Sequence, residues 1–349
     1  MDLPRYEGNI HPDEWICNIQ KFDYYWRAKY GLGYLDIAIS LVDATIKLPD
    51  DIFTGEELRN ALKEDISFTI FKNTNKRKLQ SLKYNLERNG GDTSKFVSTF
   101  RKLCYNAEID DIEEQKKYLY KTLPNNHFDY ISNEFYKKMK DVDSINELVR
   151  RFEDIVFEES NLIRNESIVA LKHVATGKYL SSIKNLSYIT GSKSQMVFVG
   201  STEPVPNSLW KIKFDKELAT YPDTPINLQH IKSEMFLGLS FNRNTHYPHN
   251  YYYLRSPCTK YTEVSCNGND KDWIFRHSKF ENYDGSLKSN DTINLSIKKT
   301  KVINDKEEFL SSHDIHCSIG NYTFQEVVCL SDRLGRNEEW CIELIHGGS

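Results

Sequence analysis

The sequence predicts a chain of two domains, an all-α domain followed by an all-β domain. Three observations lead to this fold class. Apolar residues recur at helical spacing through residues 12–160, short β-branched and aromatic runs replace them after residue 160, and one motif then occurs three times. The length of 349 residues suits two domains of ordinary size.

The first half carries the start and stop signals of about eight helices. Trp15, Ile19, Phe22 and Trp26 form one stripe of the first helix, with Pro12 in its first turn. Four further helices are marked by their first residues: one opened by the capping box Thr54–Glu57 and holding Leu58, Leu62 and Ile66, one opened by Asp92, one between Asp111 and Pro124, and one opened by the capping box Ser144–Glu147. Three more are indicated by their apolar residues: a segment of about 34–47, one through Leu79, Leu82 and Leu86, and one with Phe128, Ile131 and Phe135.

The pattern changes after Glu159, where Gly, Asn, Asp and Ser begin to separate short strand-like runs. No Pro- or Gly-rich linker marks the change. We therefore expect an all-α domain over 1–162 and an all-β domain over 163–349, with a helix that leads almost directly into the first strand.

The second half repeats itself three times. Each copy opens with a strand-like run, at Val169, Ile226 and Ile293. A leucine and then a tryptophan follow in each copy, 30, 36 and 30 residues apart: Leu180 and Trp210, Leu237 and Trp273, Leu310 and Trp340. The longer spacing of the second copy comes from an insertion at 242–255. These matching positions indicate one structural unit used three times.

A four-stranded unit cannot bury its apolar face alone, so the three copies are expected to close on one another. A six-stranded barrel with a hairpin cap removes the free sheet edges, and this arrangement is the β-trefoil. The alternative is a three-bladed propeller fragment, but propellers have about four to eight blades. We expect the repeated Leu and Trp side chains to face a shared core.

The run Leu171-Lys-His-Val-Ala-Thr-Gly-Lys-Tyr-Leu-Ser-Ser182 resembles the MIR repeat, and the resemblance extends over about 168–346. The second copy keeps His230 and Leu237, and the third has Ile297 in place of the histidine. The resemblance implies a β-trefoil and a non-catalytic module that binds a ligand or a partner. His173 and His230 are expected to be structural, since no nucleophile or carboxylate recurs beside them.

The first half resembles the Gag (capsid-type) domain of retrotransposons. The segments that carry the resemblance run from Leu79 to Cys104 and from Tyr118 to Pro124, and Trp15 and Phe22 fit the opening helix of that family. The resemblance implies self-association into a homo-oligomer. The zinc knuckles and protease that normally follow in Gag polyproteins are not found here, so it does not imply autonomous transposition or nucleic-acid packaging.

The insertion in the second copy offers the candidate binding residues. Tyr251, Tyr252 and Tyr253, with His246 and His249, form an aromatic-rich segment that the other copies lack, and such a segment is expected to be a recognition loop. The alternative is that the tyrosines simply cover the end of the barrel. His246 and His249, with Cys258 and Cys266 nearby, match no standard zinc spacing, and we expect no metal site and no cofactor.

The densest basic cluster is Lys72, Lys76, Arg77 and Lys78, which could contact phosphates. A solvated helix face is the alternative. The net charge of −4 argues against a general nucleic-acid binder. Gly91-Asp92-Thr93-Ser94 resembles an aspartic-protease triplet, but Ser replaces the required Gly, so Asp92 is expected to cap a helix.

The seven cysteines are an odd number without a C-x-x-C pair, and we expect reduced thiols in a cytoplasmic protein without a signal peptide or membrane span. No spaced catalytic set is found, so an enzyme is not expected. The leading hypothesis is a binding and assembly protein: the helical domain self-associates and the trefoil recognises a ligand or protein. The alternatives are a lectin-like or small-ligand-binding trefoil on a helical scaffold, and an RNA-binding capsid-like protein.

Overall fold

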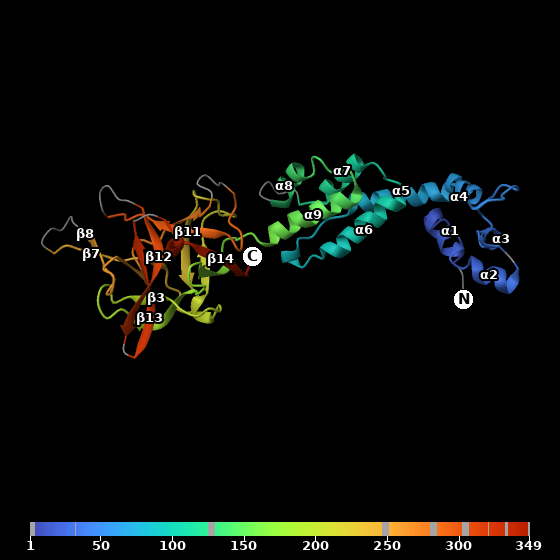
Figure 1. Ribbon diagram of the computed structural model, residues 1–349. Coiled ribbons are helices and arrows are strands. Elements are labelled where there is room, and N and C mark those ends of the chain that lie inside the picture. The colour runs from blue at the N-terminus through green and yellow to red at the C-terminus, as the bar shows by residue number, and fades with distance from the viewer. Residues whose placement is uncertain are drawn as a thin grey trace. The chain divides into compact units, whose positions relative to one another are not determined.

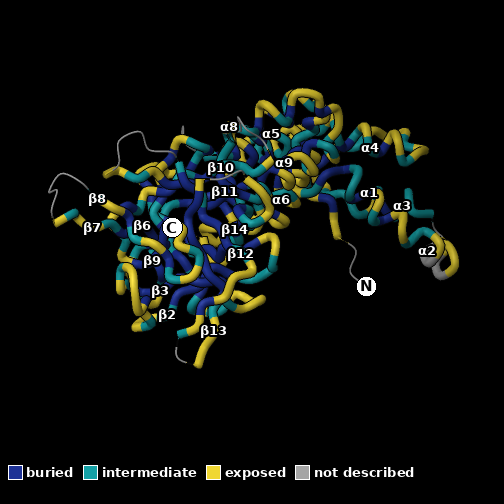
Figure 2. The backbone as a smooth tube through the Cα atoms, turned by 60° about the vertical axis from the view of Figure 1, so that its left-hand side comes forward, coloured by how far each residue is buried: buried dark blue, intermediate teal, exposed yellow. Residues whose placement is uncertain are grey.

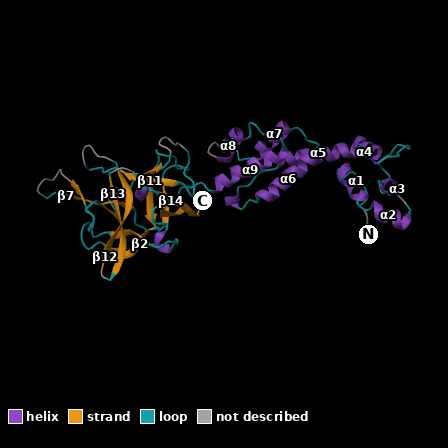
Figure 3. Ribbon diagram, in the orientation of Figure 1, coloured by secondary structure: helices purple, strands orange, loops and turns teal. Residues whose placement is uncertain are grey.

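The computed structural model describes the chain except for residues 1–3, 32, 125–129, 246–250, 280–284, 302–306, 320, 332–333 and 348–349, and for 25, 26, 29 and 30 it describes the backbone alone. The chain divides into two compact units, Met1–Glu159 and Ser160–Ser349. Within the described residues, the first unit is helical and the second is built of strands (Figures 1 and 3). We call them the helical unit and the sheet unit.

The helical unit contains α-helices of seven to sixteen residues and one 3₁₀ turn at Glu87–Asn89. None of the helices in the described part of the chain is both long enough and apolar enough to cross a membrane. The helices are α1 (Pro12–Gln20), α2 (Asp23–Tyr30), α3 (Tyr34–Ser40), α4 (Gly55–Glu64), α5 (Ile66–Ser81), α6 (Thr93–Asn106), α7 (Ile112–Thr122), α8 (Tyr130–Lys138) and α9 (Ile145–Ser160).

The caps predicted at Thr54 and Asp92 are present, and at Ser144 one half of the predicted capping box is seen, with the Glu147 N–H donating to Ser144 Oγ over 3.3 Å. Thr54 and Glu57 form the capping box of α4, with the Glu57 N–H donating to Thr54 Oγ1 over 3.1 Å and the Thr54 N–H donating to Glu57 Oε2 over 2.9 Å. Asp92 Oδ1 accepts from the Lys95 N–H over 2.8 Å at the start of α6. Asp92 is therefore a helix cap, as its sequence context indicates.

Several predicted helix boundaries are wrong. The helix expected over about 34–47 ends at Ser40, because Leu41 and Asp43 bond instead to the backbone of Tyr6. The helix expected through Leu79–Leu86 ends at Ser81, because the Tyr84 N–H donates to the Thr122 carbonyl over 2.9 Å. In both cases the backbone forms hydrogen bonds with a distant segment, and the local spacing of apolar residues gives no sign of that partner.

Two other helices are divided differently. The stripe from Trp15 to Trp26 spans two helices, since α1 ends at Gln20 and α2 begins at Asp23. Ile66 belongs to α5 rather than α4, because Asp65 starts a new helix by accepting from the Ser67 N–H over 2.8 Å. Phe128 lies outside the described residues.

The helical unit buries two separate apolar clusters. One is built around Trp15, Ile16 and Ile19 of α1 with Leu58 and Leu62 of α4. The other gathers side chains from α5 to α9, among them Phe100, Phe135 and Phe152. The apolar core of the helical unit is thus divided in two, with α4 and α5 separated by a single residue at Asp65.

The sheet unit is antiparallel throughout its described strands. These are β1 (Ile168–His173), β2 (Leu180–Ser187), β3 (Gln195–Val199), β4 (Trp210–Lys213), β5 (Pro225–His230), β6 (Leu237–Leu239), β7 (Phe241–Arg243), β8 (Tyr251–Tyr253), β9 (Thr262–Cys266), β10 (Trp273–His277), β11 (Thr292–Ile297), β12 (Glu308–Ile319), β13 (Tyr322–Leu330) and β14 (Trp340–His346).

Six strands close into a ring, in the order β1, β4, β5, β10, β11, β14 and back to β1. Three hairpins, β2–β3, β6–β9 and β12–β13, lie beside the ring, and their strands β3, β9 and β13 pair with one another. Figure 2 shows the buried backbone concentrated inside this unit. Each of the three sequence repeats supplies two ring strands and one hairpin.

The repeated tryptophans occupy matching sites, as predicted. Trp210, Trp273 and Trp340 are fully buried, and each indole Nε1 donates to a leucine carbonyl, at 2.9, 3.0 and 3.0 Å. The accepting residues are Leu180, Leu237 and Leu310, the same leucines that the repeat identifies. The three copies therefore share one core.

The repeated histidines are structural. His173 Nδ1 lies 2.9 Å from Thr176 Oγ1 and its Nε2 lies 3.1 Å from the Asn337 carbonyl. His230 makes the same two contacts, to Ser233 and to the Asn207 carbonyl. Ile297 takes the third position, opposite Trp273 in the sheet.

The expectation that all cysteines are reduced thiols is wrong for one pair. Cys258 and Cys317 form a disulfide, with Cα atoms 6.2 Å apart, a separation typical of such bonds. The two residues are 59 positions apart and belong to the second and third repeats, so only the closed fold brings them together. Cys17, Cys104, Cys266, Cys329 and Cys341 are free.

Candidate binding site

The predicted recognition segment forms a separate two-stranded hairpin. Strands β7 and β8 pair with each other, and in the described residues they do not join the twelve-stranded sheet (Figures 1 and 3). Asn242 lies opposite Tyr252, and Phe241 lies opposite Tyr253. This hairpin, which we call the β7–β8 hairpin, is the insertion that lengthens the second repeat. His246 and His249 lie outside the described residues.

Tyr253 anchors the hairpin rather than presenting a contact surface. Its side chain is buried, and its hydroxyl donates to Asp270 and accepts from the Lys301 N–H over 3.3 Å. Asp270 also accepts two hydrogen bonds from Thr300, one from its backbone N–H over 3.0 Å and one from its side-chain hydroxyl over 2.7 Å. Burial, and then the Asp270 carboxylate, raise the pKa of Tyr253. The phenol is therefore neutral and fixed.

A cluster of aromatic side chains packs together on one face of the hairpin. Phe241 packs edge-on against Tyr251 and Tyr253, with ring centroids 5.6 and 5.5 Å apart. The Lys301 ammonium lies 5.8 Å from the Tyr251 ring and 5.9 Å from the Phe241 ring, within cation–π range. Tyr251 is accordingly half-buried.

The other face of the hairpin is open. Side chains alternate along a strand, so Tyr252 points away from the cluster formed by its two neighbours. Its side chain is 49% exposed, and Asn242 opposite it is also exposed. A planar aromatic ring beside an amide on an anchored hairpin offers stacking and hydrogen bonding together, as binding surfaces often do.

The structure thus divides the predicted tyrosines by role. Tyr252 is available for contact, Tyr251 is partly available, and Tyr253 holds the hairpin in place. The sequence did not single out Phe241, Asp270 or Lys301. Phe241 directly precedes the insertion and carries a weak signal, whereas the positions of Asp270 and Lys301 depend on tertiary folding.

The predicted basic cluster lies on α5, and two of its cations are paired. The Lys72 ammonium lies 2.9 Å from Glu108, and that of Lys76 lies 3.4 Å from Glu114. Burial opposes ionisation of Glu108, but hydrogen bonds from Lys63 and Lys72 hold the pKa of its carboxyl below the ordinary value. The Arg77 guanidinium donates to Thr74 over 3.2 Å.

Lys78 lines a cavity of about 680 Å³ in the helical unit. The cavity lies between α5 and α6, where Lys102 also contributes to its wall and Asn75 and Asn106 are nearly buried. The four predicted cations therefore do not converge on one open surface. Lys78 alone of them faces this cavity.

Comparisons with known proteins assign no family. No family model and no curated protein matches the chain. Among solved structures the chain is similar to the SDF2-like protein from Arabidopsis thaliana, at 22% identity over 52% of this chain and 94% of that one, with a TM-score of 0.41. It is also similar to a Caenorhabditis elegans protein of unknown function, at 18% identity over 53% of this chain and 98% of that one, with a TM-score of 0.42.

A third similar structure is the ricin B-like lectin of Macrolepiota procera, solved in complex with lactose. The identity is 11% over 52% of this chain and 98% of that one, with a TM-score of 0.30.

Proposed function

We propose that the protein is a non-enzymatic binding protein. Its sheet unit is a β-trefoil of the MIR type, and the open face of the β7–β8 hairpin contacts a carbohydrate or a protein partner. The observation that carries this proposal is Tyr252, an aromatic side chain 49% exposed on a hairpin that Tyr253 and Asp270 fix at its base. The closed ring with three hairpins and matching tryptophans supports the trefoil assignment.

The anchoring of Tyr253 is the reason to favour the hairpin over the rest of the surface. An exposed aromatic on a fixed ribbon loses little conformational entropy on binding, since only its two side-chain torsions have to be ordered. A bound sugar ring would stack on the Tyr252 face and donate to or accept from the Asn242 amide. A protein partner would use the same pair of groups at the centre of a small interface.

A paired screen tests the proposal. The full chain is applied to a glycan array and to an array of proteins, in parallel with the variants Tyr252→Ala and Tyr322→Ala. Tyr322, 72% exposed on β13, is a matched control from another hairpin. We expect specific signals for the wild type, their loss in Tyr252→Ala and their retention in Tyr322→Ala. Equal signals for all three proteins, or none for the wild type, would contradict the proposal.

A second candidate function is self-association through the helical unit. Ile66 and Ile70, four residues apart on one face of α5, are 68% and 58% exposed, which is unusual for large aliphatic side chains. This pair supports the homo-oligomer that the Gag-like resemblance implies. An assembled protein would present several hairpins together and convert weak contacts into tight ones.

Light scattering over a concentration series tests this second candidate. We expect the mass of the wild type to rise with concentration and that of the variant Ile66→Glu/Ile70→Glu to stay at one chain. A wild type that remains a strict monomer at high concentration and varied salt would remove the assembly proposal and leave the binding proposal intact.

A further inference from the structure

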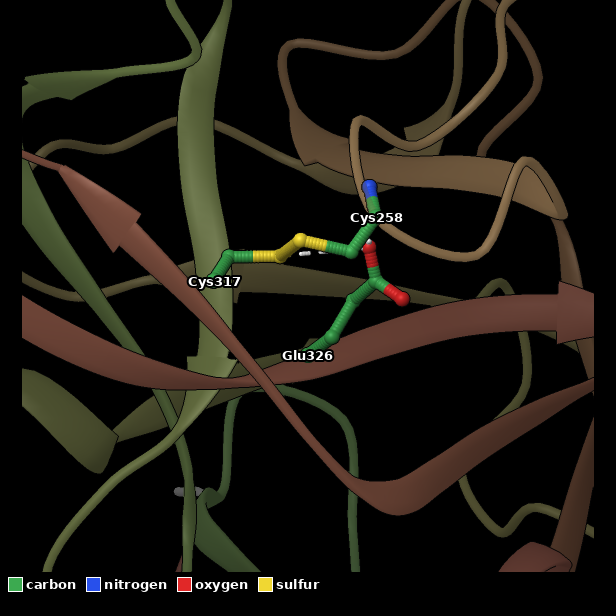
Figure 4. Close-up of side chains that lie close together, drawn as sticks. All are labelled: Cys258, Cys317 and Glu326. Atoms are coloured by element: carbon green, nitrogen blue, oxygen red, sulfur yellow. Dashed lines mark hydrogen bonds between the residues drawn. A yellow bond between two sulfur atoms is a disulfide. The ribbon is translucent and has the colours of Figure 1, made fainter.

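Two cysteines and a buried glutamate meet between the second and third repeats of the sheet unit. Cys258 lies in the turn before β9, Cys317 in β12 and Glu326 in β13, and Figure 4 shows their side chains converging. One donor atom from each residue lies within 4.8 Å of the others. The two sulfur atoms are joined as a disulfide.

The glutamate is not satisfied by the contacts around it. Glu326 is 2% exposed. Its Oε1 accepts from the Cys258 N–H over 3.3 Å and lies 3.4 Å from Cys317 Sγ. Its Oε2 is buried without a hydrogen-bond partner among the described residues. A buried carboxylate with an unpartnered oxygen is costly, and a cation bound through Oε1 would neutralise its charge.

The repeat supplies an internal comparison. Glu263 stands where Glu326 does, directly before the repeated valine of its middle strand. It likewise accepts from a turn backbone N–H, that of Ser192, over 3.3 Å. The acceptor contact is therefore part of the shared fold. At Glu326, Cys258 of the second copy and Cys317 of the third add two sulfurs to this contact, which gives Glu326 a set of metal-binding donors that Glu263 lacks.

We propose that Cys258, Cys317 and Glu326 form a redox-gated site for a zinc-type divalent cation. A dithiol reductant supplies two electrons and two protons to the disulfide and becomes a disulfide itself. The two released thiols then lose their protons to water and bind the cation as thiolates, with the carboxylate as third ligand. A water molecule completes the tetrahedron, which is the usual arrangement for zinc with three protein ligands.

The distances suit this coordination. Zinc–sulfur and zinc–oxygen bonds of about 2.3 and 2.1 Å in a tetrahedron place a sulfur about 3.6 Å from the oxygen and about 3.8 Å from the second sulfur. Cys317 Sγ and Glu326 Oε1 already lie 3.4 Å apart. Once the disulfide is broken, Cys258 is the residue that has to adjust, and it lies in an exposed turn.

The surroundings favour a bound ion. Cys317 belongs to an apolar cluster with Tyr188, Met196 and Phe198. On the Cys317 side, such surroundings lower the local dielectric constant and strengthen the attraction between a thiolate and a cation. The disulfide and the metal are mutually exclusive, yet either one joins the second repeat to the third, so the cross-link is kept in both redox states.

Zinc binding to the reduced full chain tests the proposal. The protein is reduced with a phosphine, freed of metal and titrated with Zn²⁺ against a coloured chelator, and X-ray absorption then reports the ligands. We expect about one Zn²⁺ per chain, a ligand shell of two sulfurs and light atoms, and no binding at this site after re-oxidation. The variants Cys317→Ser and Glu326→Gln should weaken binding by at least about tenfold, since losing even a residue that only orients a ligand costs about 10–100-fold.

Two controls guard against misfolding and stray thiols. The variants Glu263→Gln and Cys17→Ser change the equivalent carboxylate and an exposed free thiol, and both should retain wild-type affinity. Circular dichroism checks that every variant is folded. Binding by the reduced wild type no tighter than by the folded double variant Cys258→Ser/Cys317→Ser, or a shell without sulfur, would overturn the proposal.

Discussion

The tryptophan that ends each repeat has the same hydrogen bond and the same complete burial in all three copies. Replacing Trp210, Trp273 or Trp340 by Phe removes the indole N–H and leaves a leucine carbonyl without its donor. We expect each substitution to lower the free energy of unfolding of the sheet unit by about 2 kcal/mol. Urea denaturation followed by circular dichroism measures this loss.

The matched control is Tyr322→Phe, which changes an exposed ring and should leave the denaturation midpoint unchanged. Similar losses in the three tryptophan variants are the result expected of equivalent sites. If one of the three substitutions left the free energy of unfolding unchanged, the three tryptophan sites would not be equivalent.

The buried histidines predict a dependence of stability on pH. Burial lowers the pKa of His173 and of His230 below the ordinary value of 6.5. Protonation therefore favours the unfolded chain. The contribution of these two side chains to the free energy of unfolding is complete above pH 6.5 and is lost as the pH falls through their folded-state pKa values. We expect the melting temperature to fall on acidification below pH 6.5.

The variant His173→Gln/His230→Gln isolates this contribution. Its melting temperature should be lower than that of the wild type at pH 7.5, and the difference should shrink as the pH falls. If the difference in melting temperature stayed constant across the pH series, titration of these side chains would not contribute to the pH dependence of stability.

Single residues were predictable where the repeat marks them. The Leu–Trp pairs and the replacement of a histidine by Ile297 were found by comparing the copies, because equivalent positions meet equivalent surroundings. The Cys258–Cys317 bond and the ion pairs of Lys72 and Lys76 were not found. Their partners are 59, 36 and 38 residues away, and nothing local in the sequence marks them.

At the scale of the elements, the Tyr253 hydroxyl is one of the anchors of the β7–β8 hairpin. The variant Tyr253→Phe removes the hydroxyl that bonds to Asp270 and the Lys301 backbone while it keeps the ring. We expect a loss of about 1–3 kcal/mol in the free energy of unfolding, since a buried carboxylate loses a donor. Thermal unfolding measures the change.

The companion variant Tyr252→Ala should leave that stability within about 0.5 kcal/mol of the wild type, as surface substitutions do. A large loss of stability in Tyr252→Ala would mean that this residue supports the fold rather than a partner. An unchanged stability in Tyr253→Phe would mean that the anchor is not needed.

Elements were predicted well where a cap and a periodic stripe agree, as for the helices opened by Thr54 and Asp92. They were predicted poorly where the backbone bonds to a distant segment. The ends of α3 and α5 are set by backbone hydrogen bonds to Tyr6 and Thr122. A periodic run of apolar residues does not show that these bonds replace the next helical turn. The position of the hairpin followed from its insertion, but the division of its tyrosines between two faces required the register with Phe241 and Asn242.

For the whole molecule, the charge distribution predicts weak binding to RNA. The chain carries a net charge of −4, and Lys72 and Lys76 already pair with glutamates. We expect filter binding of single-stranded RNA to be low and nearly flat between about 50 and 200 mM salt, because few counterions are released. A steep loss of binding over this range, reduced further by Lys78→Ala, would instead favour the RNA-binding alternative.

The division into a helical and a sheet unit follows from the change of hydrophobic period near residue 160, which is why it could be predicted. The repeat spacing marked the insertion that carries Tyr252, but it does not mark what binds there, because an exposed ring and an amide suit more than one class of partner. The central claim is that the open face of the β7–β8 hairpin touches the partner.

Photo-crosslinking tests this claim most directly. A benzophenone amino acid is placed at position 252 in the full chain, or at position 322 as the control, and irradiated in the native cell. The account predicts a discrete covalent adduct from position 252 and none from position 322. Adducts of equal yield from both positions, or none from position 252, would contradict it.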